Sequence, residues 1–269
     1  MPSPVGVLVC VKRVPDSTEE VVLSEDGQSV DGRRSGFTMS AHEECAVELA
    51  VQTTTAVGGE ATVLTIGDAD AVEQLRNALA VGCTAATHVV GEQFTFGPAD
   101  VSREIAAVVR DHESEGRAHD LVLLGNDAAD SGDFQVGIRL AYELGRPVVN
   151  GASTVTVEES PEGPVVVAVG EGPEGQETYR VPLPAVVTIR EGGVEPRYPS
   201  VPGRLKAKKI AIEERQPVSA TTGSGRVRLV LPPPTPSAVQ ILGTGPEAAP
   251  AVVDVLEKLG VLSPGKAAQ

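Results

Sequence analysis

Residues 183–210 read LPAVVTIREGGVEPRYPSVPGRLKAKKI and contain three segments of different character. The first, 183–189, is a β-branched apolar run of strand length, which predicts a buried strand. The second, 191–203, holds three Gly and three Pro. That composition predicts an exposed loop that contains neither a helix nor a sheet ladder. The third, 204–210, is rich in Lys and Arg.

Two apolar residues of this loop, Tyr198 and Val201, have little around them to pack against. One interpretation is an ordinary surface loop that ends in a solvated basic turn. The other is a docking arm, because apolar tips on rigid loops commonly meet a partner protein.

Composition limits the class of protein. The chain has 269 residues and 41% hydrophobic content, enough for one large domain with an appendage or for two small domains. Aromatic residues make up only 3% and Trp is absent, so Val, Ala and Leu must build the core. The net charge of −15 argues against nucleic acid and anionic membranes as partners.

The cysteines and the first residues bear on location. Cys10, Cys45 and Cys83 are widely spaced and odd in number, which predicts reduced thiols rather than disulfides or a metal site. Residues 1–11 enter a strand directly, without the basic region of a secretory signal. No apolar run approaches the roughly 18 residues of a membrane span. We therefore expect a cytoplasmic protein.

Strand and helix patterns alternate through the first half of the chain. Near-continuous apolar runs predict strands, and amphipathic runs that end in Gly or begin with acidic residues predict helices. Ser40 followed by Glu43 matches a capping box at the first helix. The predicted strands are 5–14, 61–67, 87–92 and 120–126, and the predicted helices are 42–57, 68–82, 102–114 and 134–145.

Four such repeats predict an α/β fold with a mostly parallel sheet and helices on both faces. A ligand is expected in the crevice beyond the carboxyl ends of the strands, where the strand order reverses. In this sequence those ends are Cys10–Arg13, Ile66–Asp68 and Gly125–Asp133.

The pattern changes after Gly145. Residues 146–190 contain no helical pattern and predict a small section of antiparallel strands. Residues 213–237 include TTGSG and PPPTP, which predicts an extended linker, and 249–262 predicts a short amphipathic helix. We expect a core over 1–212 and an extended arm over 213–269 that wraps a partner.

The segment 125–136 is a candidate phosphate site. Gly125 ends a strand, and unpaired N–H groups at the following helix start could hold a phosphate. The alternative is an ordinary turn with Asp133 as the N-cap of that helix. Asp127, Asp130 and Asp133 lack the Gly and distal Glu of a calcium loop, so no metal is expected.

Two glycine-rich motifs give no evidence for a binding site. GEGPEG (170–175) joins two strands, and GTGPEA (243–248) has no following strand, so neither predicts a dinucleotide site. No nucleophile–base pair is visible, and the four histidines are scattered along the sequence.

Five segments together resemble one family. They are VCVKRVPD (9–16), MSAHEECAVELAV (39–51), LRNALAVGCTAATHV (75–89), DLVLLGNDAADSGDFQVG (120–137) and the opening stretch 183–210. Their content and order closely resemble the electron-transfer flavoprotein β subunit. The matches span residues 5–212.

The resemblance implies a Rossmann-like fold of the adenine nucleotide α-hydrolase-like type. It implies a heterodimer in which an α subunit binds most of an FAD and this chain completes the flavin crevice and holds a structural AMP. The chain would then be an electron carrier and not an enzyme, because the redox chemistry belongs to the flavin. Implied partners are the α subunit, acyl-CoA or other flavin dehydrogenases of fatty acid oxidation, and a quinone oxidoreductase.

The resemblance also assigns residues. Loop 191–206 is the implied recognition loop, with Tyr198, Pro199, Ser200, Val201 and Pro202 in the docking segment. Glu171 matches an acidic residue that pairs with the flavin domain of the α subunit, although an exposed hairpin charge is the equally weighted alternative. The implied cofactor-binding residues are Cys10, Ser40, Ala41, His42, Glu43, Ile66, Gly125, Asn126, Asp127, Ala128, Ala129, Asp130, Ser131, Gly132, Asp133, Phe134, Gln135 and Val136.

This chain departs from the family pattern at the nucleotide loops. Phe134 and Val136 stand where the family has Asn and Thr, and Ser40-Ala41 replaces Asn-Pro. The departures leave two alternatives: a flavin-bifurcating member with a second FAD in place of AMP, and a stand-alone adenine-nucleotide-binding regulatory protein.

Overall fold

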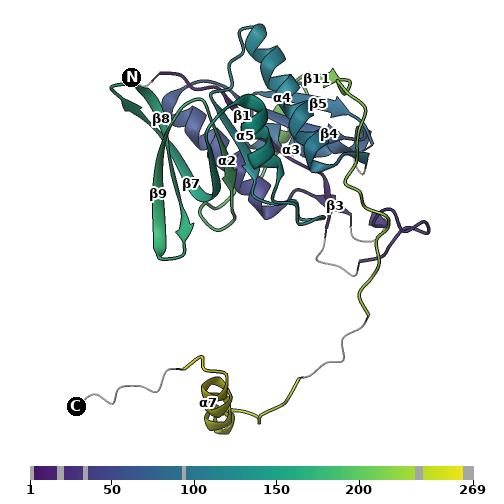
Figure 1. Ribbon diagram of the computed structural model, residues 1–269, viewed down its shortest axis with the longest axis vertical. Coiled ribbons are helices and arrows are strands. Elements are labelled where there is room, and N and C mark those ends of the chain that lie inside the picture. Colours follow the sequence, from purple (N-terminus) through teal and green to yellow (C-terminus); the bar gives the residue numbers. More distant parts are fainter. Residues whose placement is uncertain (1–2, 17–20, 33–35, 93–94, 234–238, 263–269) are drawn as a thin grey trace. The chain divides into compact units, whose positions relative to one another are not determined.

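The computed structural model describes residues 3–16, 21–32, 36–92, 95–233 and 239–262. The chain forms two compact units, Met1–Val230 and Leu231–Gln269. The first unit contains the sheet and its covering helices (Figure 1).

A nine-stranded sheet organises the first unit, with the strand order β11-β5-β4-β1-β6-β10-β7-β8-β9. The strands from β11 to β7 run parallel, β8 is antiparallel to β7, and β9 is antiparallel to β8. The bounds are β1 Val7–Cys10, β4 Ala61–Gly67, β5 Ala85–Val90, β6 Leu121–Gly125, β7 Val148–Ser160, β8 Gly163–Gly172, β9 Gly175–Pro182, β10 Ala185–Ile189 and β11 Ile212–Arg215. A second small sheet pairs β2 (Val14–Pro15) with β3 (Phe37–Thr38).

Helices cover both faces of the sheet, as predicted. The helices α2 (Ala41–Val57) and α3 (Val72–Val81) pack on one face, together with the short α6 (Val201–Ala207). The helices α4 (Pro98–Ser114) and α5 (Val136–Leu144) pack on the other face. A 3₁₀ turn, η1 (Ala69–Ala71), precedes α3. The expected α/β fold is therefore confirmed.

The central strands are buried on both faces because their side chains alternate between two apolar cores. In β1, Val7 and Val9 belong to the core under α2, whereas Leu8 and Cys10 belong to the core under α4 and α5. Fully burying one such aliphatic side chain stabilises the fold by roughly 1.5–3 kcal/mol. The continuous apolar runs in the sequence are a direct consequence of this double burial.

One strand assignment was wrong. The sequence placed 185–189 among antiparallel strands, but β10 lies between β6 and β7 and is parallel to both. The antiparallel strands β7, β8 and β9 extend this same sheet instead of forming a separate section. After β9 at the sheet edge, the chain returns to the centre of the sheet, where β10 pairs with β6 and β7. Local sequence patterns do not encode such long-range pairing.

The prediction that 191–203 holds no helix is wrong at its last three residues. Helix α6 begins at Val201, with the Ser200 side chain accepting the N–H of Gly203. Pro202 lies in the first helical turn, where its missing N–H is not needed. The Gly- and Pro-rich segment is therefore a loop whose last three residues begin a helix.

The segment after residue 212 begins as structure and not as a linker. Residues Ile212–Arg215 form β11, which pairs with β5 at the edge of the sheet. The segment then runs along α4, with hydrogen bonds from Val218, Ser219, Thr222 and Gly223 to that helix.

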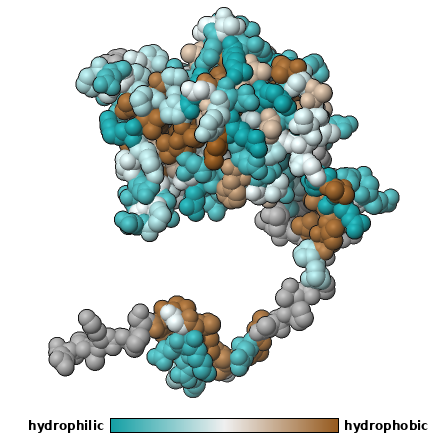
Figure 2. Space-filling model, viewed as in Figure 1, coloured by the Kyte–Doolittle hydropathy of each residue, from teal (hydrophilic) through white to brown (hydrophobic). Residues whose placement is uncertain are grey.

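The described residues of the second unit include the helix α7 (Ala249–Lys258), after a 3₁₀ turn at Pro246–Ala248. No residue of α7 is buried, and Figure 2 shows apolar and polar side chains exposed on it. Within the described ranges, no helix is long and apolar enough to cross a membrane.

Candidate functional site

A cavity lies at the carboxyl ends of β1 and β6. These strands are neighbours, but the chain leaves β1 toward β4 and β5 and leaves β6 toward β10 and β7, so the strand order reverses between them. Such a reversal leaves a crevice in open α/β sheets. The cavity is lined by Cys10, Val11, Lys12, Glu43, Leu64, Ile66, Phe96, Gly97, Pro98, Val101, Ile105, Leu124, Gly125, Asn126, Asp127, Ala128, Ser131, Asp133, Val136 and Gly137.

The structure brings about half of the sequence-derived cofactor residues to this cavity. Those in the lining are Cys10, Glu43, Ile66, Gly125, Asn126, Asp127, Ala128, Ser131, Asp133 and Val136. Those outside the lining, although in the same loops, are Ser40, Ala41, His42, Ala129, Asp130, Gly132, Phe134 and Gln135.

The sequence missed the wall that α4 supplies. Phe96, Gly97 and Pro98 lead into this helix, and Val101 and Ile105 follow on its inner side. This wall and Ile66 of β4 make the inner part of the cavity apolar. The only signal available was Pro98 at a helix start, which marks a boundary and not a binding site.

Glu43 is buried at the start of α2 and organises the β1 side of the site. Its carboxylate accepts the N–H groups of Lys12 at 2.8 Å and of Ser40 at 3.0 Å, and the Ser40 side chain accepts the N–H of Glu43. The predicted capping box is therefore confirmed. Burial raises the pKa of Glu43 to about 7, although the hydrogen bonds from Ser40 and Lys12 oppose the rise. Glu43 is thus a carboxyl group that titrates near neutral pH beside the cavity.

An ion pair and a histidine–carboxylate contact join the β1–α2 side to the loop after β6. Lys12 Nζ lies 2.7 Å from Asp130 Oδ1, and His42 Nδ1 lies 3.2 Å from Asp127 Oδ1. Lys12 is the one cation among the described residues that line the cavity. Asp127 and Asp133 also belong to the lining, so its acidic side chains outnumber this single cation.

The loop after β6 is held by the neighbouring strand ends. The Thr188 hydroxyl of β10 lies 2.8 Å from Asn126 Oδ1 and 3.0 Å from Asn150 Oδ1. Gly137 lies against the same threonine: an added Cβ would come within 2.2 Å of Thr188 Cγ2. The close approach of α5 to β10 therefore requires glycine at this position.

The alternative in which Asp133 is the N-cap of the helix is wrong. Helix α5 begins at Val136, with Gln135 in the N-cap position and no side-chain cap. Asp133 instead accepts the hydroxyl of Ser131 at 2.9 Å. Phe134, which stands where the family has Asn, is 52% exposed.

Cys10 lies at the end of β1 in the cavity lining and is a free, buried thiol. Burial raises its pKa far above the usual range, and the neighbouring Glu43 adds to the rise. The thiol therefore stays protonated and acts as an apolar lining group.

The candidate residues of the recognition loop lie beside α2 and α3, on the face of the sheet opposite the α4 wall of the cavity. Tyr198 is 93% exposed and Val201 is 73% exposed, while Arg197 beside them binds the buried Glu48 carboxylate through Nε at 2.7 Å and Nη2 at 2.6 Å. Gly203 approaches α3 so closely that an added Cβ would lie 2.2 Å from the carbonyl oxygen of Ala80. Tyr198 and Val201 are thus exposed side chains on a loop whose neighbouring residues Arg197 and Gly203 are held against α2 and α3.

Glu171 lies near the end of β8, opposite Gln176 in β9, and its side chain is exposed. The described part of the chain gives it no ion-pair partner.

Two of the histidines that are separated in the sequence meet in the fold. His112 at the end of α4 and His119 before β6 are both buried, and their rings are in contact. Among the described residues, no group of three or more His, Cys, Asp or Glu side chains could hold a metal ion.

The fold and the cavity define a doubly wound α/β protein with its candidate ligand site at the switch point of the sheet. The family model that describes the electron transfer flavoprotein domain matches residues 30–220. The chain belongs to the electron transfer flavoprotein β-subunit family.

Three relatives support this assignment. The electron transfer flavoprotein subunit beta of Bacillus subtilis (strain 168) is 35% identical over 209 residues, which cover 78% of each chain. The subunit beta of Syntrophomonas wolfei is 32% identical over 237 residues, covering 87% of this chain and 89% of the relative. The subunit beta of Homo sapiens is 36% identical over 215 residues, covering 78% and 81%.

Proposed function

We propose that this chain pairs with an α subunit to form an electron carrier, completes the FAD site of that heterodimer and holds AMP in the cavity between β1 and β6. Membership of the β-subunit family supports the pairing and the flavin. The cavity carries the nucleotide part, because it lies at the switch point where α/β proteins bind such ligands.

The residues of the cavity fit the base and ribose of an adenylate. The apolar wall of Phe96, Val101 and Ile66 suits a purine ring, and Asn126, Asp127 and Ser131 offer polar groups for ribose hydroxyls. FAD shared with an α subunit would lie outside this cavity, so no residue here is assigned to the isoalloxazine.

The phosphate has fewer partners. Phe134 and Val136 offer no side-chain hydrogen bonds, and Lys12 is already paired with Asp130. The N–H groups of the first turn of α5 remain as donors, since that helix has no side-chain cap. We infer that AMP is held mainly through its nucleoside part.

The docking role rests on the loop that carries Tyr198 and Val201. In this proposal, a flavin dehydrogenase, such as an acyl-CoA dehydrogenase of fatty acid oxidation, grips these exposed side chains and reduces the flavin, and a quinone oxidoreductase accepts the electrons. The flavin supplies the redox chemistry, and the chain positions it and selects partners. Glu171 is proposed to pair with a basic residue of the flavin domain.

The last part of the arm, residues 231–269, is proposed to wrap the α subunit. Helix α7 exposes Val252 and Val253, Leu259 directly after it is also exposed, and no residue of this helix is buried. Deleting residues 231–269 leaves the first unit whole and should lower the yield of α subunit that copurifies with a tagged β chain. A full yield would contradict this role.

One extraction tests the pairing with the α subunit and the two cofactors. The chain is coexpressed with its α subunit, purified by a tag on this chain and denatured, and the released FAD and AMP are counted. One FAD and one AMP per complex is the expected result. Two FAD without AMP would replace the proposal by a flavin-bifurcating carrier, and neither an α subunit nor flavin would replace it by a stand-alone nucleotide binder.

A further inference from the structure

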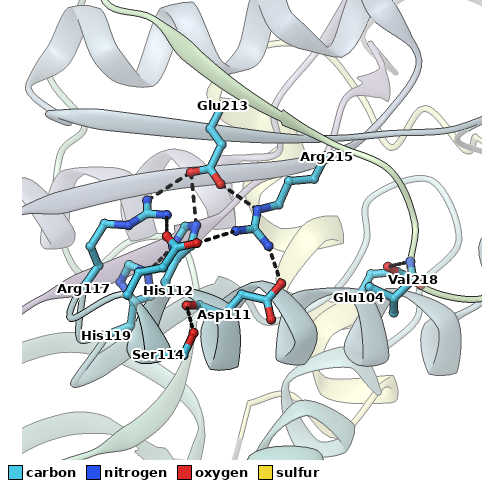
Figure 3. Close-up of polar contacts among 10 residues, drawn as sticks. Glu104, Asp111, His112, Ser114, Arg117, His119, Glu213, Arg215 and Val218 are labelled. Carbon is cyan, nitrogen blue, oxygen red and sulfur yellow. Dashed lines mark hydrogen bonds and ion pairs between the residues drawn. The ribbon is translucent and has the colours of Figure 1, made fainter.

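Helix α4 contacts β11 and the chain segment that follows it along most of the length of the helix. Near its C-terminal end, Asp111 pairs with Arg215 at 2.5 Å, and His112 lies 3.2 Å from Glu213 (Figure 3). Two turns earlier, Glu104 accepts the N–H of Val218 at 2.8 Å. The segment therefore runs back along the helix toward its N-terminus.

The last contact of this segment with α4 is at Asp100, which is only 1% exposed. Its carboxylate accepts the N–H of Thr222 at 3.0 Å, the hydroxyl of Thr222 at 2.8 Å and the N–H of Gly223 at 2.8 Å. It also accepts the N–H of Gly97 at 3.0 Å and pairs with Arg103. Burial alone would raise the pKa of Asp100, but the hydrogen bonds from Thr222, Gly97 and Gly223 hold it well below its usual range.

The same turn of α4 forms the wall of the cavity. Gly97 and Pro98 line it, and Val101 follows directly after Asp100. The backbone of the segment touches this wall: an added Cβ at Gly97 would lie 2.2 Å from the carbonyl oxygen of Gly223. Asp100 thus ties the cavity wall and residues 222–223 to one carboxylate.

We propose that Asp100 is a positioning residue for the nucleotide site, and that residues 218–223 act as an external brace that holds the α4 wall in place. The inference rests on the proposed nucleotide site. Because the brace and the ligand both stabilise one position of Gly97–Val101, the binding of each must favour the other. AMP binding should therefore tighten the brace, and loss of the brace should weaken AMP binding.

The test uses the αβ complex stripped of nucleotide, with AMP as the probe and calorimetry as the measurement. Asp100→Asn keeps the size of the side chain but places an amide donor against N–H donors. Asp111→Asn is the matched control, because it makes the same change on the same helix about three turns from the cavity. We expect Asp100→Asn to raise the Kd for AMP at least fivefold and Asp111→Asn to change it less than twofold.

Hydrogen exchange supplies a second readout that a purely structural role would not move. In the wild-type complex, AMP should slow exchange of the amides of Val218, Ser219, Thr222 and Gly223. Should Asp100→Asn fold poorly, Thr222→Val removes only the hydroxyl contact and is expected to weaken AMP binding, with Thr222→Ser restoring it.

The outcomes separate the brace from the site itself. Two results would overturn the brace and leave the nucleotide site intact. One is equal AMP affinity in the wild type, Asp100→Asn and Thr222→Val, and the other is hydrogen exchange at 218–223 that does not change when AMP binds. A wild-type complex that binds no AMP would overturn the nucleotide site and the brace together.

Discussion

The Nδ1 atom of His112 lies 2.8 Å from the Nε2 atom of His119, and both rings are buried. On its other side, Nε2 of His112 lies 3.2 Å from the Glu213 carboxylate, which Arg117 and Arg215 also bind (Figure 3). The cluster therefore links α4, the start of β6 and the edge strand β11. Arg146 and Glu113 complete its charged surroundings.

This cluster predicts that acid loosens β11. Burial lowers the pKa of His119 to about 4, helped by the neighbouring charges, so the folded protein keeps the ring neutral. The pKa of Glu213 is lowered to about 2, because hydrogen bonds from Arg117 and Arg215 outweigh its burial. The unfolded chain binds protons more readily at both groups, so stability falls as the pH drops through their pKa values. The contribution of His119 is lost between about pH 6.5 and 4, and that of Glu213 between about pH 4.5 and 2.

Hydrogen exchange measures this loosening directly. Amides of Ile212–Arg215, corrected for the intrinsic pH dependence, should open more often at pH 5 than at pH 7.5. His119→Phe keeps a ring without a titrating group and should flatten the dependence between pH 5 and 7. An unchanged profile in this variant would assign the acid response to other groups.

The exposed tip of the recognition loop yields a prediction about partners. Val201 is 73% exposed at the first position of α6 and makes no contribution to the core. Val201→Glu should therefore leave folding and flavin content unchanged while slowing reduction by the cognate dehydrogenase at least tenfold. Val201→Leu, which keeps an apolar tip, serves as the control in stopped-flow kinetics. Wild-type rates for the glutamate variant would remove the docking role.

The contact between α5 and β10 predicts a rescue pair. Gly137→Ala would push a methyl group against Thr188 Cγ2, and overpacking of this kind costs about 1–3 kcal/mol of unfolding free energy. Thr188→Ser removes that methyl group and keeps the hydroxyl beside Asn126. The double variant should recover most of the lost stability in a denaturant titration. Additive losses would show that the glycine is needed for another reason.

The Lys12–Asp130 pair predicts a gain of affinity. Because Asp130 pairs with Lys12, which lies in the cavity lining, Asp130→Asn should free Lys12 for an anionic ligand. Exposed ion pairs contribute about 0.2–1 kcal/mol, and this pair is half-buried, which favours the upper end of that range, so AMP should bind roughly fivefold more tightly. Adenosine, which lacks the phosphate, should bind the variant and the wild type equally. Tighter binding of both ligands would point to a change of cavity shape and not of charge.

The sequence predicts the parts of this molecule that local patterns encode. Strand β4 and the Ser40–Glu43 capping box follow from apolar runs and cap residues alone. The central position of β10 does not, because it depends on pairing with β6 and β7, which lie far away in the sequence. For the same reason, the α4 wall of the cavity was missed, whereas the loops after β1 and β6 were found at the strand ends.

The pairing of β11 with β5 has a consequence for solubility. Residues Ile212–Arg215 cover the outer edge of β5 over Ala86–Val89. Without this strand, β5 would present a row of unpaired amide and carbonyl groups, which is a template for aggregation. A chain cut before Ile212 should therefore associate edge to edge and scatter light, whereas a chain cut after Val230 should stay dispersed. The short strand is thus also a guard against self-association.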